Sequence, residues 1–326
     1  MEIHIHLNLM SHSDSDVCSN AQTTTDEGLL ATLTKQMQLQ SIGKTPSTMR
    51  NYATAINSLK SFLGSEILLA TLDQCRLSGY EHWLRNKGIC LNTVSCYMRS
   101  LRALLKGCGV DTQQLFASVF TGGTKTEKRS VDTQTIIRLR QLSLPDRTFL
   151  AMSRDVFLFC FYAMGMPFVD LAHLRKTQVS GNNIIYNRQK TGQRICVALE
   201  QPMTEILHRY MTVDSPYLFP LLKVGTDKEY RTLLGRYNRA LHRLESLLGT
   251  ERRLTSYVTR HSWASLAYRE NVDLPVISKA LGHSNTKTTM TYIREIDDQQ
   301  LVLANRNLIS KIAFPNAICY EKRSEK

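Results

Sequence analysis

Apolar residues recur at helical spacing through most of the chain. Between residues 28 and 110 they stand three or four positions apart, which predicts several amphipathic helices. One helix is expected to begin at Thr45-Pro46, where a hydroxyl cap is followed by proline. Another is expected to begin at Asn92, which can cap it, and to end at Gly107. Three basic residues share one face of this last helix: Arg99, Arg102 and Lys106.

The pattern changes twice in the remainder of the chain. Residues 121–130 are polar, basic and glycine-containing, which is typical of a linker. Helical spacing then resumes over residues 131–313, except at two strand-like runs, residues 184–190 and 193–199. The intervening Thr191-Gly192 suits a two-residue hairpin turn. We therefore expect a mainly α protein with two domains and a small β-hairpin or sheet in the C-terminal one.

Charge is distributed unevenly along the chain. The 326 residues carry a net charge of +13, yet residues 1–27 contain five acidic residues and no lysine or arginine. From residue 28 onward, 41 basic residues face 23 acidic ones. We expect residues 1–27 to form a flexible acidic tail and residues 314–326 to form a C-terminal tail. The basic body favours a polyanionic partner, with nucleic acid as the default, although a solvated basic surface is the alternative.

Several protein classes are disfavoured by the same sequence. The longest uncharged apolar run, residues 156–169, has fourteen residues, whereas a membrane-spanning helix needs about 20, so the run predicts a buried core helix. No basic segment followed by a long apolar run opens the chain, as a secretory signal would require. The eight cysteines form no CxxC pair. We therefore expect a cytoplasmic protein that has no membrane association, no metal site and no cofactor.

Residues 257–292 contain the pattern with the most specific chemistry. Arg260 lies on a predicted helix, and Gly282 is placed to end the next helix in a left-handed cap, directly before His283. Tyr292 follows nine residues after this histidine. The segment resembles the catalytic domain of the tyrosine recombinases, the phage integrase family, which has H-x-x-R, then L-G-H, then a tyrosine at this spacing. Lys190 is similar to the hairpin lysine of that family.

The resemblance extends over most of residues 28–300 and implies an architecture and partners. Residues 28–120 resemble the helical, SAM-like core-binding domain that clamps one side of DNA, and residues 131–313 resemble the catalytic domain. The amino-acid sequence of residues 165–171 and 257–263 looks similar to that of a branch of the family common in mobile elements of gut anaerobes. The implied partners are double-stranded DNA, further copies of the chain in a tetrameric synapse, and accessory DNA-bending proteins. Arg50, with the three basic residues named above, is expected to contact DNA.

The family resemblance also implies a role for each candidate residue in site-specific recombination. Tyr292 would attack a DNA phosphodiester and form a 3′-phosphotyrosine intermediate, which preserves the bond energy for rejoining. Arg260 would bind the phosphate and offset the charge of the transition state. His283 would hydrogen-bond the phosphate or help to take the tyrosine proton. Lys190 would protonate the leaving 5′-oxygen.

Two positions depart from the family pattern. Pro167 stands where the family has its first arginine, with Asp170 following as expected, and proline has neither charge nor donor. Arg154 is the nearest upstream candidate to replace that arginine, and it requires the chain to fold back at Gly165; Arg175 and Arg188 are less favoured. Tyr257 occupies the histidine position of H-x-x-R, and its hydroxyl can still donate a hydrogen bond to phosphate.

The missing arginine leaves alternatives to an active recombinase. A catalytically impaired relative would bind DNA in an architectural or regulatory role. A topoisomerase of similar chemistry would cleave with little site preference. After Tyr292, apolar residues at helical spacing continue through residues 300–315, which would pack against a neighbouring protomer or against their own domain.

Overall fold

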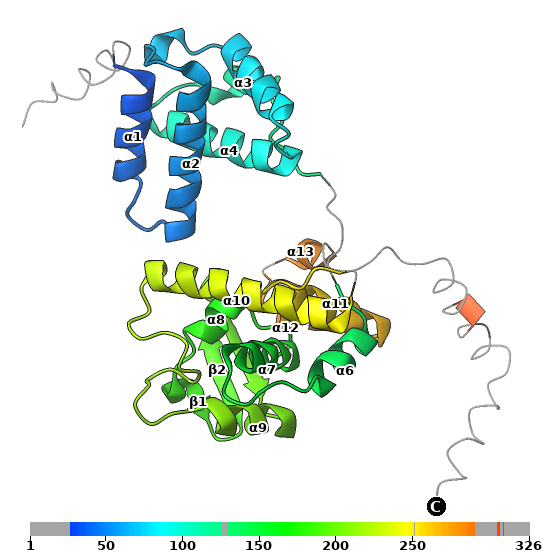
Figure 1. Cartoon of the computed structure of the whole chain (residues 1–326). Helices are drawn as coiled ribbons and strands as arrows, with labels where there is room; N and C mark the ends of the chain where they lie inside the picture. Colours follow the sequence, from blue (N-terminus) through cyan, green and yellow to red (C-terminus); the bar gives the residue numbers. More distant parts are fainter. Residues whose placement is uncertain are drawn as a thin grey trace, which may run out of the picture. The chain divides into compact units, whose positions relative to one another are not determined.

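The computed structural model of the protein describes residues 27–124, 130–250, 252–283, 285–290, 305, 306 and 309. The chain divides into two compact units, residues 1–126 and residues 127–326. Both are mainly helical, and a three-stranded antiparallel sheet lies in the second (Figure 1). The predicted fold class, mainly α with a small sheet in the C-terminal part, is confirmed.

The N-terminal unit is a bundle of helices around its own core. Its helices are α1 (Leu29–Leu39), α2 (Pro46–Leu63), the 3₁₀ helix η1 (Leu69–Thr71), α3 (Gln74–Asn86), α4 (Leu91–Gly107) and α5 (Thr112–Leu115). As predicted, α2 begins beside Thr45, whose side chain accepts a hydrogen bond from the backbone amide of Thr48. The helices α1, α2 and α4 face one another across buried leucines, which explains the apolar spacing in this part of the sequence.

Asn92 has a different role from the predicted one. The residue that precedes α4 is Cys90, and its side chain forms no capping hydrogen bond. The Asn92 amide instead pairs with the backbone of Thr124, accepting from its N–H over 2.8 Å and donating to its carbonyl over 3.1 Å. Ser95 donates to the carbonyl of Gly122 in the same way. These bonds attach residues 122–124 to α4 of the N-terminal unit.

The C-terminal unit builds its core from helices packed on a small sheet. Its helices are α6 (Thr133–Gln141), α7 (Phe149–Tyr162), α8 (Phe168–Ala172), η2 (Lys176–Gln178), α9 (Gln201–Tyr210), α10 (Asp227–Leu248), α11 (Val258–Arg269), α12 (Leu274–Ala280) and α13 (Thr286–Met290). Its strands are β1 (Val179–Ser180), β2 (Asn183–Asn187) and β3 (Arg194–Ala198), in the order β1-β2-β3. The central helix α7 packs against α6, α9, α10 and α11 and is buried along most of its length.

Two features of this unit differ from the sequence prediction. The apolar run at residues 156–169 is not one helix, because α7 ends at Tyr162 and the chain reverses through Met164 and Gly165, both with positive φ, before α8 begins. The hairpin turn between β2 and β3 is wider than Thr191-Gly192. Ladder pairing ends at Asn187 and Arg194, and beyond it the amide of Arg188 bonds to the carbonyl of Gln193. The amide of Gly192 bonds to the carbonyl of Arg188, and the amide of Gln189, inside the turn, bonds to Asp170.

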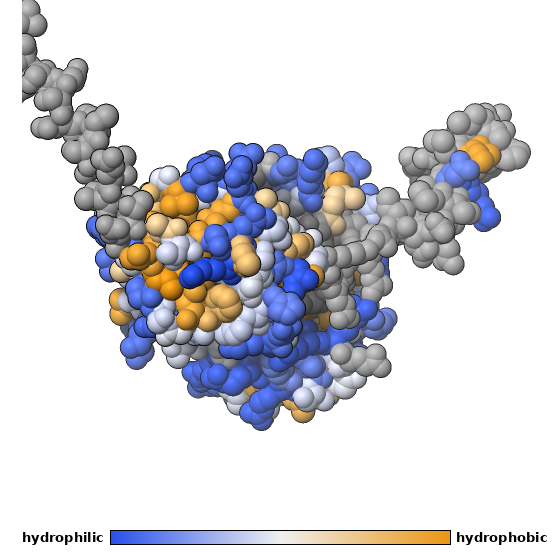
Figure 2. Space-filling view, turned by 90° about the horizontal axis from the view of Figure 1, so that it is seen from above, coloured by the Kyte–Doolittle hydropathy of each residue, from blue (hydrophilic) through white to orange (hydrophobic). Residues whose placement is uncertain are grey.

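Polar and charged residues cover much of the visible surface, beside one patch of hydrophobic residues (Figure 2). Of the helices that the structure describes, none combines the length and hydropathy needed to cross a membrane.

Candidate active site

A cavity of about 470 Å³ in the C-terminal unit brings together candidate residues that lie far apart in the sequence. Its lining includes Pro167, Asp170, Arg188, Lys190, Tyr257, Arg260 and His283. Among the lining residues that the structure describes, three are cationic and one is a carboxylate. Two of the cations, Arg188 and Arg260, are 7% and 3% exposed. Burying two positive charges with only one carboxylate to balance them is energetically costly. The cavity is therefore suited to an anion.

Arg260 is a buried residue in the lining of this cavity. It lies in the first turn of α11, and its guanidinium donates to the carbonyl of Gly165 over 3.3 Å and to the carbonyl of Leu281. Gly165 permits this packing, because a Cβ atom there would lie 2.9 Å from the Cα atom of Arg260. The positive φ of Gly165, +70°, also favours glycine. The turn after α7 therefore holds the arginine from one side and the end of α12 holds it from another.

His283 is placed by the C-terminal cap of α12. The amide of Gly282 bonds to the carbonyl of Lys279, and the amide of His283 bonds to the carbonyl of Ser278, which is a Schellman motif. Gly282 has a φ of +62°, as that motif requires and as the sequence predicted. The cap turns the imidazole toward Arg260, whose guanidinium lies 2.9 Å from its Nε2 atom.

The charge state of His283 follows from its neighbours. A guanidinium can only donate, so Nε2 accepts from Arg260 and the ring proton is on Nδ1, which donates to the hydroxyl of Thr289 over 2.8 Å. Burial, together with the positive charges of Arg260, Arg188 and Lys190, lowers the pKa of His283 to about 4. His283 is therefore neutral at pH 7 while the cavity holds no anion.

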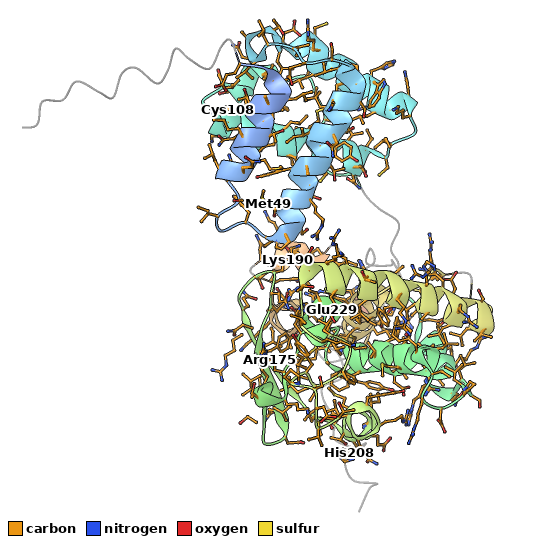
Figure 3. All side chains as sticks on the ribbon, turned by 60° about the vertical axis from the view of Figure 1, so that its left-hand side comes forward. Met49, Cys108, Arg175, Lys190, His208 and Glu229 are labelled. Carbon is orange, nitrogen blue, oxygen red and sulfur yellow. The ribbon has the colours of Figure 1, made fainter. Side chains whose placement is uncertain are left out.

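Lys190 reaches the cavity from the loop between β2 and β3. It is exposed, and Figure 3 shows it at one end of the C-terminal unit. The loop is attached to α8 by Asp170, whose carboxylate accepts from the backbone amide of Gln189 over 3.0 Å. Asp170 is buried, and desolvation raises its pKa although the Gln189 hydrogen bond and the Arg188 charge oppose that rise. Asp170 therefore fixes the loop that carries the lysine.

Arg188 comes from the same loop and is directed into the protein. Its Nη1 atom donates to the carbonyls of Leu281 and Gly282, over 2.9 and 3.0 Å, and its Nε atom is 3.6 Å from the Asp170 carboxylate. Gly282 makes room for it, since a Cβ atom there would lie 2.6 Å from the Cδ atom of Arg188. Arg188 thus joins the hairpin to the cap that carries His283.

The other predicted residues are placed as follows. Tyr257 lines the cavity at the start of α11, is 46% exposed, and packs edge-on against His261. Pro167 lines it too, at the start of α8. Tyr292 and most of residues 300–315 lie outside the described residues. In the N-terminal unit, Arg50 lies on α2, and the three basic residues of α4 are exposed.

Arg154 does not take the position suggested for it. It lies on α7 and is not among the residues that line the cavity. Its guanidinium donates to the carboxylate of Asp155 over 2.7 Å and to the carbonyl of Leu142 over 2.6 Å. Asp155 also accepts from Arg209 and from the hydroxyl of Tyr210. Arg154 therefore holds three parts of the fold together through a buried carboxylate, and we correct its prediction as a replacement for the missing arginine.

The sequence did not predict that Arg188 would be buried in the wall of the cavity, and it did not identify Thr289. A signal for Arg188 was present, because Ile184, Tyr186 and Arg188 alternate with more exposed residues and so share the inward face of β2 and its continuation. Thr289 gave no such signal. Its contact with His283 depends on how α13 returns to the cap of α12.

Comparison with known families is consistent with this geometry. The phage integrase family matches residues 135–299, about half of the chain. The phage integrase SAM-like domain matches residues 29–107, which cover helices α1 to α4.

Two characterised recombinases are similar in sequence across most of the chain. Tyrosine recombinase XerA of Pyrococcus furiosus is 23% identical over 262 residues, covering 77% of this chain and 85% of XerA. Tyrosine recombinase XerC of Syntrophus aciditrophicus is 23% identical over 269 residues, covering 75% of this chain and 86% of XerC.

Solved integrase structures share the fold. The Tn1549 transposon integrase, in complex with transposon right end DNA, aligns with a TM-score of 0.65 and 12% identity, covering 88% of this chain and all of that one. A lambda integrase tetramer bound to a Holliday junction aligns with a TM-score of 0.64 and 16% identity, covering 85% of this chain and 81% of that one. The matched domains and the shared fold show that the chain belongs to the phage integrase family of tyrosine recombinases, which are site-specific DNA recombinases.

Proposed function

We propose that the chain cleaves and rejoins DNA at specific sites, using Tyr292 as the nucleophile and the cavity of the C-terminal unit as the phosphate site. The observation that carries this proposal is the cluster of two buried guanidiniums, a neutral histidine and an exposed lysine around one cavity. A DNA phosphodiester supplies the anion that this cluster lacks.

Each residue has a chemical task in this proposal. The Tyr292 hydroxyl attacks phosphorus, and the 5′-oxygen leaves as the covalent 3′-phosphotyrosine forms. Arg260 offers its forked donors to the non-bridging oxygens and offsets the charge of the transition state. His283 is neutral, and its Nε2 atom can accept the tyrosine proton once Arg260 turns from it to the phosphate, which then stabilises the imidazolium. Lys190 protonates the leaving oxygen, and no step uses a metal or a cofactor.

The partners and location complete the proposal. Solved structures of related integrases include a dimer on a core site and a tetramer on a Holliday junction. We propose that this chain likewise assembles as a homo-oligomer on double-stranded DNA, with four copies in the synapse, and that accessory DNA-bending proteins assist it. The reaction on cellular DNA places the enzyme in the cytoplasm. The Tn1549 relative favours a mobile element as the source of the target DNA.

Covalent trapping tests the proposal directly. Wild-type protein is incubated with sheared DNA from its source, adducts are isolated under denaturing conditions, and the attached DNA is sequenced. A nicked duplex carrying the recovered site should then give an adduct with wild type and none with Tyr292→Phe. An adduct that survives Tyr292→Phe, or no adduct with wild type, would contradict the proposal. Relaxation of supercoiled plasmid lacking the site would indicate a topoisomerase instead.

A further inference from the structure

We propose that Arg188 replaces the arginine that is missing at position 167 and contacts the scissile phosphate as a catalytic residue. The inference rests on the proposed function, because it assigns a phosphate contact in that same cavity. Pro167 and Arg188 both line the cavity, although one begins α8 and the other follows β2. A guanidinium from the hairpin thus reaches the space that an arginine at the start of α8 would serve.

Arg188 and Arg260 converge on the same acceptor. Arg188 donates through Nη1 and Arg260 through Nη2 to the carbonyl oxygen of Leu281, so the two guanidiniums lie next to each other at the end of α12. Like charges this close repel each other in a buried site, and the single nearby carboxylate, Asp170, balances only one of them. An anion between the two guanidiniums removes this imbalance, and a phosphodiester presents two oxygens that could accept from both.

The hydrogen bonds of Arg188 leave donors for a ligand. Among the described residues its hydrogen bonds run from Nη1, and its Nε atom faces the Asp170 carboxylate at 3.6 Å, which leaves its Nη2 group for a ligand. The bonds to Leu281 and Gly282 fix the direction of the guanidinium in advance, so little entropy is lost when it binds phosphate.

The other arginines considered for this role are directed elsewhere. Arg154 is bonded to Asp155 and Leu142. Arg175 is exposed over the ring of Tyr217, and Figure 3 shows it well away from Lys190 in the same unit. Arg188 is therefore the candidate whose position in the cavity and remaining Nη2 donor agree with a phosphate contact.

A neutral phosphate analogue separates a charge-bearing role from a structural one. The test uses the nicked duplex described above, made with either a normal phosphate or a methylphosphonate at the scissile position. A methylphosphonate carries no charge, so a cation that offsets phosphate charge becomes dispensable on it. Adduct formation is compared for wild type, Arg188→Ala and Arg188→Lys, and Arg175→Ala serves as the control that removes one arginine from the same unit.

On the phosphate duplex, Arg188→Ala should form adduct about 100-fold to 1000-fold more slowly than wild type, as is usual when one charge-stabilising donor is lost. On the methylphosphonate duplex, this difference should shrink to less than about 10-fold. Arg175→Ala should match wild type on both duplexes.

Two results would overturn the inference. Equal rates for wild type and Arg188→Ala on phosphate would show that no charge is contributed. An undiminished defect on methylphosphonate would show that Arg188 only holds the cap at Gly282 and His283. If Arg188→Ala does not fold, Arg188→Lys gives the same comparison. Lysine keeps the positive charge but loses the forked donors of the guanidinium. Its defect on the phosphate duplex should be smaller, and it should also shrink on the methylphosphonate duplex. Failure of wild type to form any adduct would contradict the proposed function itself and is therefore distinguishable.

Discussion

Arg260 donates a hydrogen bond to the Nε2 atom of His283 across 2.9 Å, and this contact determines which imidazole nitrogen carries the proton. The bond requires a lone pair on Nε2, so the neutral ring with its proton on Nδ1 is the form that fits. The buried hydroxyl of Thr289 accepts that proton's hydrogen bond and fixes the ring orientation. Arginine and histidine therefore act as one unit, and a change at either residue alters the other.

The lowered pKa of His283 predicts an acid-sensitive folding stability. With a pKa of about 4 in the folded state and 6.5 in the unfolded state, His283 has no effect above pH 6.5. As the pH falls from 6.5 toward 4, the unfolded chain binds a proton that the folded chain does not, and stability decreases. His283→Asn should therefore lose less melting temperature than wild type between pH 7 and pH 4.5.

The control for this prediction is His208→Asn, which changes an exposed histidine on α9. It should show the same loss of melting temperature as wild type over that pH interval. Equal losses for wild type and His283→Asn would contradict the lowered pKa.

Arg260 is predicted to affect cleavage far more than DNA binding. Its hydrogen bonds to Gly165, Leu281 and His283 hold it as a pre-organised donor for the transition state. Arg260→Ala should slow single-turnover adduct formation by about 100-fold to 1000-fold, while affinity in a gel-shift assay changes only a few-fold. Arg260→Lys should recover little, because an ammonium cannot reproduce the fork. A parallel loss of binding and cleavage would contradict this role.

Lys190 is predicted to act on the leaving group alone. A 5′-sulfur leaving group departs as a stable thiolate and needs no proton, whereas a 5′-oxygen does. Lys190→Ala should therefore cleave a normal duplex about 100-fold or more slowly than wild type and cleave a 5′-phosphorothiolate duplex at a rate near that of wild type. A defect that persists on the sulfur substrate would show that Lys190 contributes something other than the proton.

The sequence predicted the helical architecture and several of the site residues because both depend on local patterns. Apolar spacing predicted α2, and the glycine before His283 predicted the cap that ends α12. The role of Arg188 depends on a long-range contact, since the cap it meets is more than ninety residues later in the chain. Its alternation along β2 indicated an inward face but not which partner it would find there.

The structural role of Arg154 could not be predicted from the sequence for a related reason. Helical spacing could not show that Asp155 is buried and accepts from Arg209 and Tyr210 as well as from Arg154. The hairpin turn was predicted too short for the same reason. The amide of Gln189, inside the turn, bonds to Asp170, which lies nineteen residues earlier in the chain.

Arg154 is instead predicted to support folding. Removing its guanidinium leaves one Asp155 oxygen and the Leu142 carbonyl without their donor in a largely buried position. Arg154→Ala should lower the free energy of unfolding by about 2 kcal/mol, the usual range for hydrogen bonds to a charged group. Below its melting temperature the variant should form adduct at the wild-type rate. Urea unfolding and single-turnover cleavage check the two parts, and a folded variant that cannot cleave would contradict the assignment.

The basic face of α4 is predicted to contact DNA phosphates without reading sequence. Arg99, Arg102 and Lys106 are exposed there and share one side of the helix, opposite buried leucines. Each phosphate contact releases counterions, so the slope of log affinity against log salt changes by about 0.9 for each contact that is lost. Changing all three residues to glutamine should reduce the slope by roughly 2.7 and weaken binding to specific and unrelated duplexes alike. The exposed lysine Lys228 on α10, changed to glutamine, provides the comparison for loss of one surface charge elsewhere. An unchanged slope for the triple variant would mean that these residues form an ordinary solvated helix face.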